Sequence, residues 1–185
     1  MKFSREWAMP NSDTFSIKCI RRFVERWKPQ DPNALSVDPF ARNSRFCTLR
    51  NDLNPSTEAE FHMDASDFLL SLHKEYLGKI CFAIIDPPYS VRQIAECYKG
   101  VGKEVTNKDT RCDFWPKVKK ALLPILTEDA IVLSFGWNSC GMGKKMGFEQ
   151  KEILLVAAGG NHNDTICLAE QRIPNNLAKL FEPIL

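Results

Sequence analysis

The sequence predicts an α/β fold with a mostly parallel, doubly wound sheet and an antiparallel hairpin at its C-terminal end. Two observations carry this prediction. Short apolar runs alternate with stretches of helical periodicity, and the last two apolar runs flank a turn-rich segment at 159–164. Alternating strands and helices are typical of parallel sheets that carry helices on both faces, whereas a turn between two neighbouring strands indicates a hairpin.

One amphipathic helix is predicted to open the domain. Ser12 and Asp13 are favoured N-cap residues, and Pro29 follows the last apolar residue of the pattern. The apolar residues that recur at helical spacing between them are Phe15, Ile17, Ile20, Phe23, Val24 and Trp27. Residues 28–33, which contain Pro29 and Pro32, then form a connector.

The remaining elements follow the connector in alternating order. Parallel strands are predicted at 35–40, 46–52, 80–85 and 130–135, and helices at 65–76, 91–98 and 114–126. Pro116 suits the first turn of the last helix. The two apolar runs at 152–158 and 165–170 are predicted to complete the sheet as the antiparallel hairpin.

Length and composition predict a single soluble domain over residues 1–185. The chain is 44% hydrophobic and 26% charged, which is ordinary for a globular protein of this size. It has no apolar run long enough to cross a bilayer, and its first ten residues lack the features of a secretory signal. We therefore expect a cytoplasmic protein, in a bacterium or a phage-infected cell, without a membrane partner.

The cysteine, histidine and charge patterns argue against a disulfide-rich protein, a metal site and a general polycation. The seven cysteines are scattered without a C-x-x-C pair, so free thiols are expected. The three histidines show no ligand spacing, and no metal is expected. A net charge of only +2 excludes a general polycation, so attraction to nucleic acid would have to come from local basic patches.

The tetrapeptide Asp86-Pro87-Pro88-Tyr89 carries the chemistry, because it directly follows the apolar run at 80–85. The amine of a nucleic-acid base is a poor nucleophile, since its lone pair is delocalised into the ring. The Asp86 carboxylate and the Pro87 carbonyl can both accept hydrogen bonds from one NH2 group, which favours a pyramidal nitrogen that attacks a methyl sulfonium. The prolines hold the backbone, and Tyr89 offers a face on which an extruded base can stack. The alternative is an ordinary turn after a strand.

Three other segments lie at the ends of predicted strands or at the start of a predicted helix. Residues 37–44 have the sequence Val-Asp-Pro-Phe-Ala-Arg-Asn-Ser, residues 51–52 are Asn-Asp, and residues 62–69 are His-Met-Asp-Ala-Ser-Asp-Phe-Leu. With the tetrapeptide, and in this order, they make the chain resemble the Asp-Pro-Pro-Tyr amino-methyltransferases over about residues 5–173. The chain is most similar to small DNA adenine-N6 methyltransferases of phages and prophages.

The resemblance implies a Rossmann-like sheet of seven strands, S-adenosylmethionine as cofactor and adenine N6 of double-stranded DNA as methyl acceptor. By this resemblance, the expected catalytic residues are Asp86, Pro87, Pro88 and Tyr89. Segment 37–44 is similar to the family's cofactor loop Asp-Pro-Phe-x-Gly-x-Gly, with Arg42 and Ser44 in place of the glycines. The expected cofactor-binding residues are Asp38, Pro39, Phe40, Ala41, Asn51, Asp52, Asp64, Ala65, Thr14 and Phe15.

Individual roles follow from the same resemblance. Asp52 is expected to bind the cofactor ribose, with Asn51 beside it, and Asp64 to bind the cofactor adenine. Asp64 is also a candidate N-cap for the next helix, and the two roles are compatible. Residues 5–10 and 13–15 resemble the segment over the methionine end of the cofactor, although Asp13 and Thr14 are equally good helix-capping residues.

The predicted nucleic-acid contacts lie after the catalytic loop and after the strand at 130–135. They are Lys99, Lys103, Lys108, Arg111, Trp137, Asn138, Lys144 and Lys145. The usual alternative for such lysines is a solvated surface, and for Trp137 a place in the core. With no room for a large separate target-recognition domain, we expect a short or relaxed recognition sequence, or help from a homodimer partner or another subunit.

Other functions stay open at the level of sequence. Cytosine N4 uses the same amine chemistry, and RNA adenine and protein glutamine are methylated on the same fold, the latter more typically with Asn in place of Asp86. A catalytically silent nucleic-acid-binding subunit of a methyltransferase complex is the alternative from another class. Genome protection in restriction-modification is an expectation from the phage-like resemblance.

Overall fold

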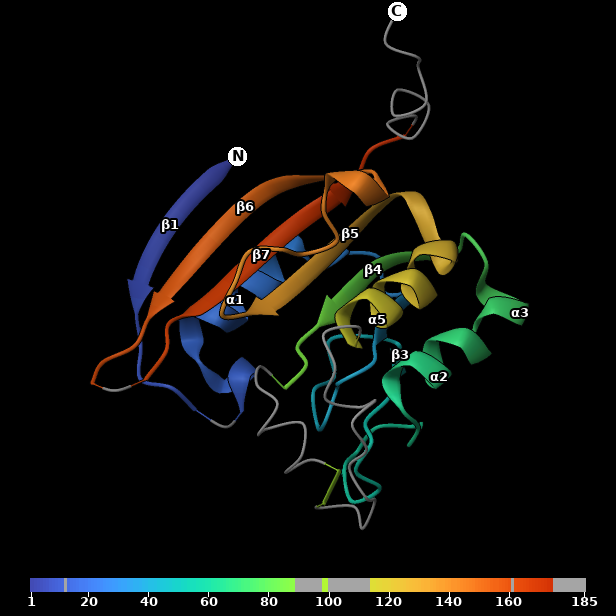
Figure 1. Ribbon diagram of the computed structural model, residues 1–185, viewed down its shortest axis with the longest axis horizontal. Coiled ribbons are helices and arrows are strands. Elements are labelled where there is room, and N and C mark those ends of the chain that lie inside the picture. The colour runs from blue at the N-terminus through green and yellow to red at the C-terminus, as the bar shows by residue number, and fades with distance from the viewer. Residues whose placement is uncertain (12, 89–97, 100–113, 161, 175–185) are drawn as a thin grey trace, which may run out of the picture.

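A computed structural model of the chain describes residues 1–11, 13–88, 98–99, 114–160 and 162–174. These residues form a seven-stranded sheet in the order β1-β6-β7-β5-β4-β2-β3 (Figure 1). The strands are β1 Lys2–Trp7, β2 Ser36–Asp38, β3 Leu49–Arg50, β4 Ile80–Ile85, β5 Leu126–Gly136, β6 Phe148–Ala157 and β7 Thr165–Arg172. All neighbours are parallel except β7, which is antiparallel to both β5 and β6. The predicted fold class and C-terminal hairpin are confirmed.

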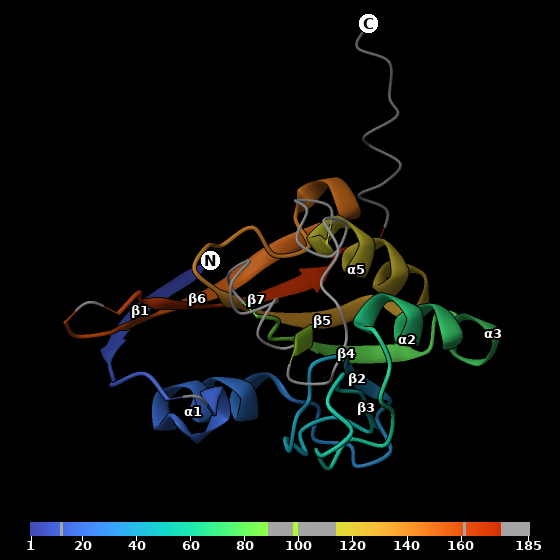
Figure 2. The same cartoon turned by 60° about the horizontal axis from the view of Figure 1, so that its bottom comes forward.

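Helices cover both faces of the sheet (Figure 2). Helix α1, Lys18–Trp27, packs on one face, and α2 Ala65–Ser71, α3 His73–Tyr76 and α5 Phe114–Leu122 lie on the other. Successive residues of β4 enter the two cores alternately: Phe82 and Ile84 pack with α1, whereas Ala83 and Ile85 pack with α2 and α5. β4 is therefore buried on both faces, which explains its continuous apolar sequence.

The N-terminus differs from the prediction. The chain begins with strand β1, and α1 starts only at Lys18, preceded by the 3-10 turn η1 Thr14–Ser16 that Asp13 caps. Ser12, the other predicted cap, lies outside the described residues. β1 was missed because all its residues except the half-buried Ser4 are exposed, so no buried face leaves a pattern in its sequence.

Other boundaries shift for local reasons. The predicted strands 35–40 and 46–52 shorten to β2 and β3, because side chains take over the pairing: Ser36 N–H donates to Thr48 Oγ1 and Thr48 N–H to Ser36 Oγ, both at 2.9 Å. The predicted helix 114–126 ends at Leu122 and continues as the 3-10 turn η2 Leu123–Ile125, which contains Pro124. The predicted helix 65–76 divides at Leu72 into α2 and α3. Residues 91–97 of the remaining predicted helix lie outside the described part.

Two further expectations concern the described residues as a group. The cysteines among them are free thiols: Cys19, Cys47, Cys81, Cys140 and Cys167. Cys97 and Cys112 lie outside the described part. No helix within the described ranges combines the length and apolar character that a membrane span requires.

Candidate active site

The candidate site lies where the chain changes direction across the sheet. From β2 the chain moves outward to β3 and then returns to place β4 on the other side of β2. The carboxyl ends of β2 and β4 therefore flank a topological switch point, where open α/β sheets bind their ligands. Asp38 ends β2 and Asp86 follows β4. The predicted cofactor loop and the predicted catalytic loop therefore meet at the carboxyl ends of these strands.

Asp38 has a buried carboxyl group with one unpaired oxygen. The side chain is 1% exposed, and its Oδ1 accepts a hydrogen bond from Phe40 N–H at 3.0 Å. Its Oδ2 is buried and, among the described residues, meets no hydrogen-bond donor. Burial raises the pKa of Asp38 well above its ordinary value, and the charges of Asp86 and Asp52 raise it further. A cationic group at Oδ2 would satisfy this oxygen and stabilise its charge.

The loop after β2 keeps a glycine-like backbone without glycine. Arg42 has a positive φ of 49°, a conformation that glycine adopts freely and that costs other residues roughly 1–2 kcal/mol. Ala41 N–H donates to Asn51 O at 2.8 Å, and Arg42 N–H donates to Asp52 Oδ2 at 3.1 Å. These bonds hold Arg42 in the turn where the resemblance expects the first glycine. Pro39 and Ala41 are buried and Phe40 is half-buried.

Asn51 joins three segments from inside. Its side chain is fully buried, and its amide donates to Pro39 O at 3.1 Å and to Met63 O at 3.0 Å. Its Oδ1 accepts from Met63 N–H at 2.9 Å. These internal bonds give Asn51 a structural role, because they position the loops on either side of Asp52; its predicted contact with the cofactor stays a prediction.

Asp52 lies at the surface of the same edge, where its carboxylate is half-buried. Oδ1 accepts from Asn54 N–H at 2.9 Å and Oδ2 from Arg42 N–H at 3.1 Å, which leaves further lone pairs on both oxygens. Phe61 and Met63, exposed by 37% and 36%, follow in the next segment, and Asp52 N–H donates to Phe61 O at 3.0 Å. An acidic group beside exposed apolar side chains suits a ligand that has hydroxyl groups and a flat ring.

Asp64 serves as the N-cap of α2, one of the two roles expected for it. Its Oδ1 accepts from Ser66 N–H at 2.9 Å. Its Oδ2 accepts from the Tyr98 hydroxyl at 2.7 Å, a contact that no sequence pattern indicated. Tyr98 thus ties the segment after the catalytic loop to the predicted adenine end of the cofactor site. Ala65, the neighbouring predicted residue, is buried in the core.

The structure describes the predicted catalytic tetrapeptide up to its third residue. Asp86 and Pro88 are half-buried and Pro87 is buried, directly beyond the end of β4. Asp86 is close enough to Asp38 for its charge to raise the pKa of that carboxyl group. Tyr89 lies outside the described residues, so its predicted stacking role stays a prediction.

Phe15 packs in the interior, although the resemblance places it at the cofactor. Its ring makes edge-to-face contacts with Phe46 at 5.6 Å and Phe135 at 5.4 Å between ring centroids. It is 9% exposed, so it holds η1 against the loop after β2 and the end of β5. Thr14 beside it is half-buried. For both residues, direct contact with the cofactor stays a prediction.

The predicted nucleic-acid contacts separate into two groups. Trp137 is 43% exposed and Asn138 is exposed, and both follow β5 at the same edge as Asp86. Lys144 and Lys145 form the turn η3, Lys144–Met146, which directly precedes β6 and therefore lies at the amino ends of the parallel strands, away from Asp86 (Figure 1). The structure does not bring these two lysines into the site.

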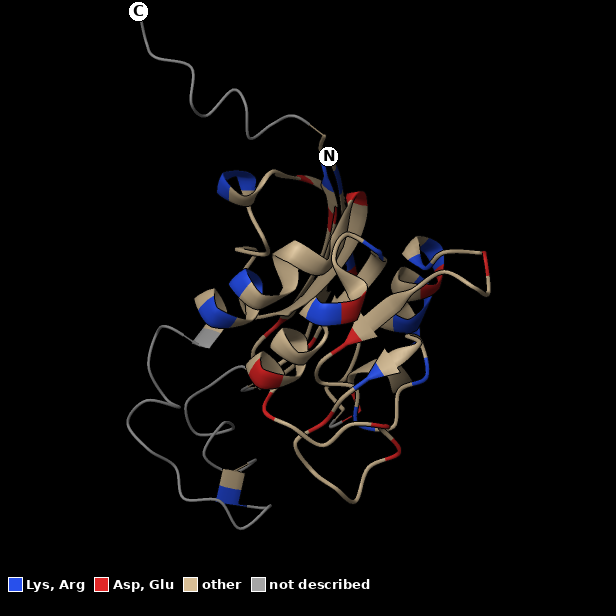
Figure 3. Cartoon of the chain, turned by 90° about the vertical axis from the view of Figure 1, so that its right-hand side faces the viewer, with Lys and Arg blue, Asp and Glu red and all other residues tan. Residues whose placement is uncertain are grey.

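The other basic residues give little further support to a DNA contact surface. Lys99 is exposed, and Lys103, Lys108 and Arg111 lie outside the described residues. In the view of Figure 3, Lys and Arg are interspersed with Asp and Glu over the described surface. The region that would contact DNA is therefore still defined by the sequence prediction around residues 99–111.

Comparisons with known proteins add to this geometry at the level of the fold. No family model and no curated protein matches the sequence. The structure is similar to that of SMU.776, assigned as a methyltransferase and solved with SAH, with a TM-score of 0.55 and 14% identity over 82% of this chain and 48% of that one. It is also similar to TrmN from Thermus thermophilus, with a TM-score of 0.52 and 12% identity over 85% of this chain and 49% of that one.

A third similar structure carries a different name. It is assigned as a hemolysin from Streptococcus thermophilus, with a TM-score of 0.50 and 12% identity over 83% of this chain and 64% of that one. The chain thus spans about half the length of the first two structures and less than two thirds of the third. At these identities the likeness shows the fold: a seven-stranded Rossmann-like sheet that methyltransferases also use.

Proposed function

We propose that this chain transfers a methyl group from S-adenosylmethionine to the N6 amine of adenine in DNA. The observation that carries the proposal is the position of Asp86-Pro87-Pro88 at the carboxyl end of β4, beside Asp38 at the end of β2. This arrangement places a hydrogen-bond-accepting loop and a buried carboxyl group on opposite sides of one switch point. A methyl donor and an amine acceptor need to meet at such a place.

Three acidic residues along this edge fit the cofactor. Asp38 offers a buried Oδ2, which has no hydrogen-bond partner among the described residues, to the α-amino group of the methionine part. Asp52 retains acceptor capacity for the ribose hydroxyls, and Asp64 for the adenine amine. The first of the similar structures contains SAH, the product that this cofactor leaves behind. The bound cofactor supplies an electrophilic methyl group on a positively charged sulfur.

The chain's own groups act on the acceptor amine. The Asp86 carboxylate and the Pro87 carbonyl accept hydrogen bonds from its two N–H groups, so the nitrogen lone pair leaves conjugation with the ring. The lone pair forms the new N–C bond as the C–S bond breaks, and the electron pair of that bond stays on sulfur. The methylated nitrogen then loses one proton, which a carboxylate in hydrogen-bond contact with it can accept.

The choice of adenine rests on the resemblance that places Asp first in the tetrapeptide. Cytosine N4 presents the same kind of amine, so the same residues would serve it with a smaller ring. RNA adenine differs mainly outside the reacting base. The experiment below therefore distinguishes these acceptors by the methylated product that each would give.

The experiment is transfer of labelled methyl groups from S-adenosylmethionine to unmethylated duplex DNA, followed by nucleoside analysis of the digested product. N6-methyladenine is the expected product. N4-methylcytosine, or label in RNA alone, would move the proposal to that acceptor. Bound cofactor without transfer to any nucleic acid would contradict it and favour a silent subunit or a protein substrate.

A further inference from the structure

Strand β1 forms an open edge of the sheet. It pairs with β6 on one side, and within the described ranges no strand pairs with its other side (Figure 1). Phe3 and Trp7 on this strand are 63% and 66% exposed. Proteins protect an edge with proline, a bulge, a very short strand or charged side chains. β1 has six residues, no proline and an unbroken register with β6, and its charged residues, Lys2, Arg5 and Glu6, carry both signs.

The backbone groups of β1 that face outward can be assigned. Ala8 N–H donates to Ala157 O at 3.1 Å, and Trp7 is the register partner of Ala157. In a parallel pair, the backbone N–H and C=O groups of every second residue bond to the neighbouring strand. Because Ala8 bonds to β6, so do Glu6, Ser4 and Lys2. The N–H and C=O groups of Phe3, Arg5 and Trp7 therefore point away from the sheet.

This edge is complementary to itself. Two antiparallel copies of β1 can pair only in registers that bring these outward groups face to face. With Ser4 opposite Ser4, Lys2 lies opposite Glu6 and Phe3 opposite Arg5. A shift toward the C-terminus sets Arg5 against Arg5. The reverse shift sets Lys2 against Ser4 and Arg5 against Met1, so neither of these charges meets an opposite one. The Ser4-centred register alone pairs unlike charges and avoids like ones.

We propose that β1 pairs antiparallel with β1 of a second copy of this chain, across a twofold axis at Ser4. The contact is isologous, so it closes a dimer and leaves neither β1 edge free. It joins the two sheets into one, and because the paired strands are antiparallel, the two candidate active sites open toward opposite ends of that sheet. The exposed Phe3 and Trp7 gain neighbours on the face away from α1.

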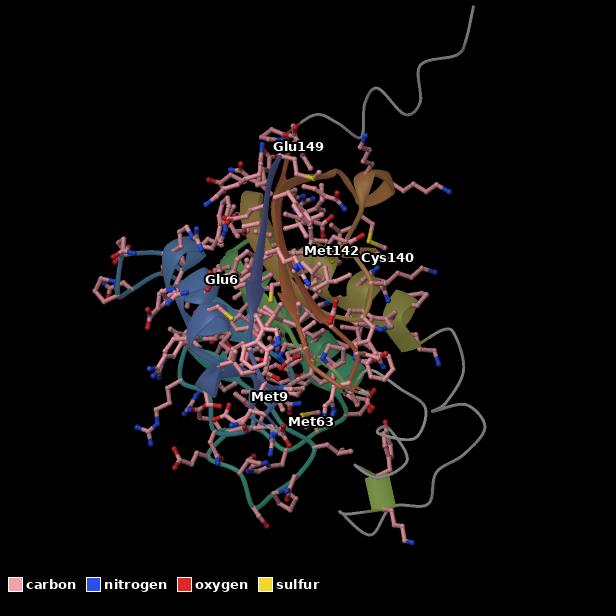
Figure 4. All side chains as sticks on the ribbon, turned by 90° about the vertical axis from the view of Figure 1, so that its left-hand side faces the viewer. Glu6, Met9, Met63, Cys140, Met142 and Glu149 are labelled. Atoms are coloured by element: carbon pink, nitrogen blue, oxygen red, sulfur yellow. The ribbon has the colours of Figure 1, made fainter. Side chains whose placement is uncertain are left out.

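Charges already present on the α1 face extend into this contact. Glu6 accepts from Arg22 at 2.6 Å, and Lys2 lies 3.1 Å from the buried Glu152. Figure 4 looks onto this edge and shows Glu6 beside α1. Lys2 and Glu6 are 59% and 43% exposed, so each can meet its opposite from the second copy. Charges of alternating sign would then cross the dimer contact: Arg22 and Glu6 of one copy, followed by Lys2 and Glu152 of the second copy.

The first test uses the symmetry axis. In a Cys140→Ser background, which removes the exposed thiol among the described cysteines, Ser4→Cys should form an intermolecular disulfide linking position 4 to position 4 under mild oxidation. Ser56→Cys is the matched control, because this exposed serine follows β3, at the other edge of the sheet from β1, and takes no part in the proposed contact. Equal cross-linking of both variants, or a link that peptide mapping places elsewhere, would overturn the proposal.

The second test uses the charges. Sedimentation of the full chain should show a concentration-dependent dimer that Lys2→Glu or Glu6→Lys weakens about tenfold or more, and that the double variant restores. Circular dichroism melting checks that each variant is folded. A wild-type chain that stays monomeric at high concentration would overturn the proposal, and so would a dimer that neither single substitution weakens.

Discussion

Two carboxylates, Asp38 and Asp86, follow neighbouring strands, and burial separates their roles. Asp38 is almost fully buried, whereas Asp86 is half-buried at the start of the catalytic loop. Burial raises the pKa of Asp38, so the ionised group is destabilised until a cation pairs with it. Asp38 therefore suits a binding role toward an ammonium group, and Asp86 suits contact with a neutral amine.

The first prediction concerns Asp38→Asn. Because the folded pKa of Asp38 is raised, the wild-type protein loses stability as the pH rises through that pKa. The variant should melt at a higher temperature than the wild type at neutral pH, and the gain should shrink as the pH falls and Asp38 becomes protonated. Cofactor affinity should fall at the same time. Calorimetry at several pH values checks stability, and a variant less stable than the wild type at neutral pH would contradict this account.

The second prediction concerns Tyr98, whose hydroxyl donates to Asp64 Oδ2. If this bond orients Asp64 toward the cofactor amine, Tyr98→Phe should weaken binding of S-adenosylhomocysteine by about three- to tenfold, the worth of one hydrogen bond. Binding of an analogue without the 6-amino group should change little. Titration calorimetry with both ligands checks this. An equal loss for both would show that Tyr98 acts only on local structure.

At the scale of elements, β4 could be predicted, because burial on both faces leaves a continuous apolar run in the sequence, directly before the motif Asp86-Pro87-Pro88-Tyr89. The edge strand β1 could not, because its exposure leaves no such pattern. Asn51 was assigned to the cofactor from its place at a strand end, but its role in joining three segments depends on contacts between residues twelve positions apart. The Tyr98–Asp64 bond spans 34 positions and leaves no local signal.

The connection between β5 and β6 depends on the buried Glu170. Its carboxylate accepts from Met142 N–H at 2.5 Å and Gly143 N–H at 3.0 Å. Burial raises the pKa of Glu170, while these two bonds and the charge of Lys119 act in the opposite direction. Glu170 was not singled out from the sequence, because an acidic residue at a strand end is common on a surface.

The third prediction tests this connection. Gly141 has a φ of +34°, and a Cβ atom there would overlap the Glu170 carboxylate and also meet Leu168 Cδ2. Gly141→Ala should lower the free energy of unfolding by roughly 1–3 kcal/mol, because the carboxylate must move from its backbone donors. Gly160→Ala is the matched control, since it has a similar positive φ of +65° but nothing within 4 Å. Urea unfolding compares them, and equal losses would contradict the role of Glu170.

At the scale of the whole molecule, the order of strands brings the predicted cofactor loop and the predicted catalytic loop together. Return of the chain from β3 to β4 creates the switch point, and the helices on both faces bury the strands that carry it. The alternating pattern of the sequence predicts this architecture. It does not predict which basic residues face the site, because Lys144 and Lys145 follow β5 in sequence but lie at the opposite edge.

The most direct test of the central claim compares wild type with Asp86→Asn, a substitution of nearly equal size. Both proteins should bind S-adenosylhomocysteine with similar affinity, because Asp38, Asp52 and Asp64 are unchanged. With S-adenosylmethionine and unmethylated duplex DNA, the wild type should produce N6-methyladenine, and the variant should lose at least a hundredfold in rate. N6-methyladenine formed equally by both proteins would show that the loop after β4 is not the catalytic centre.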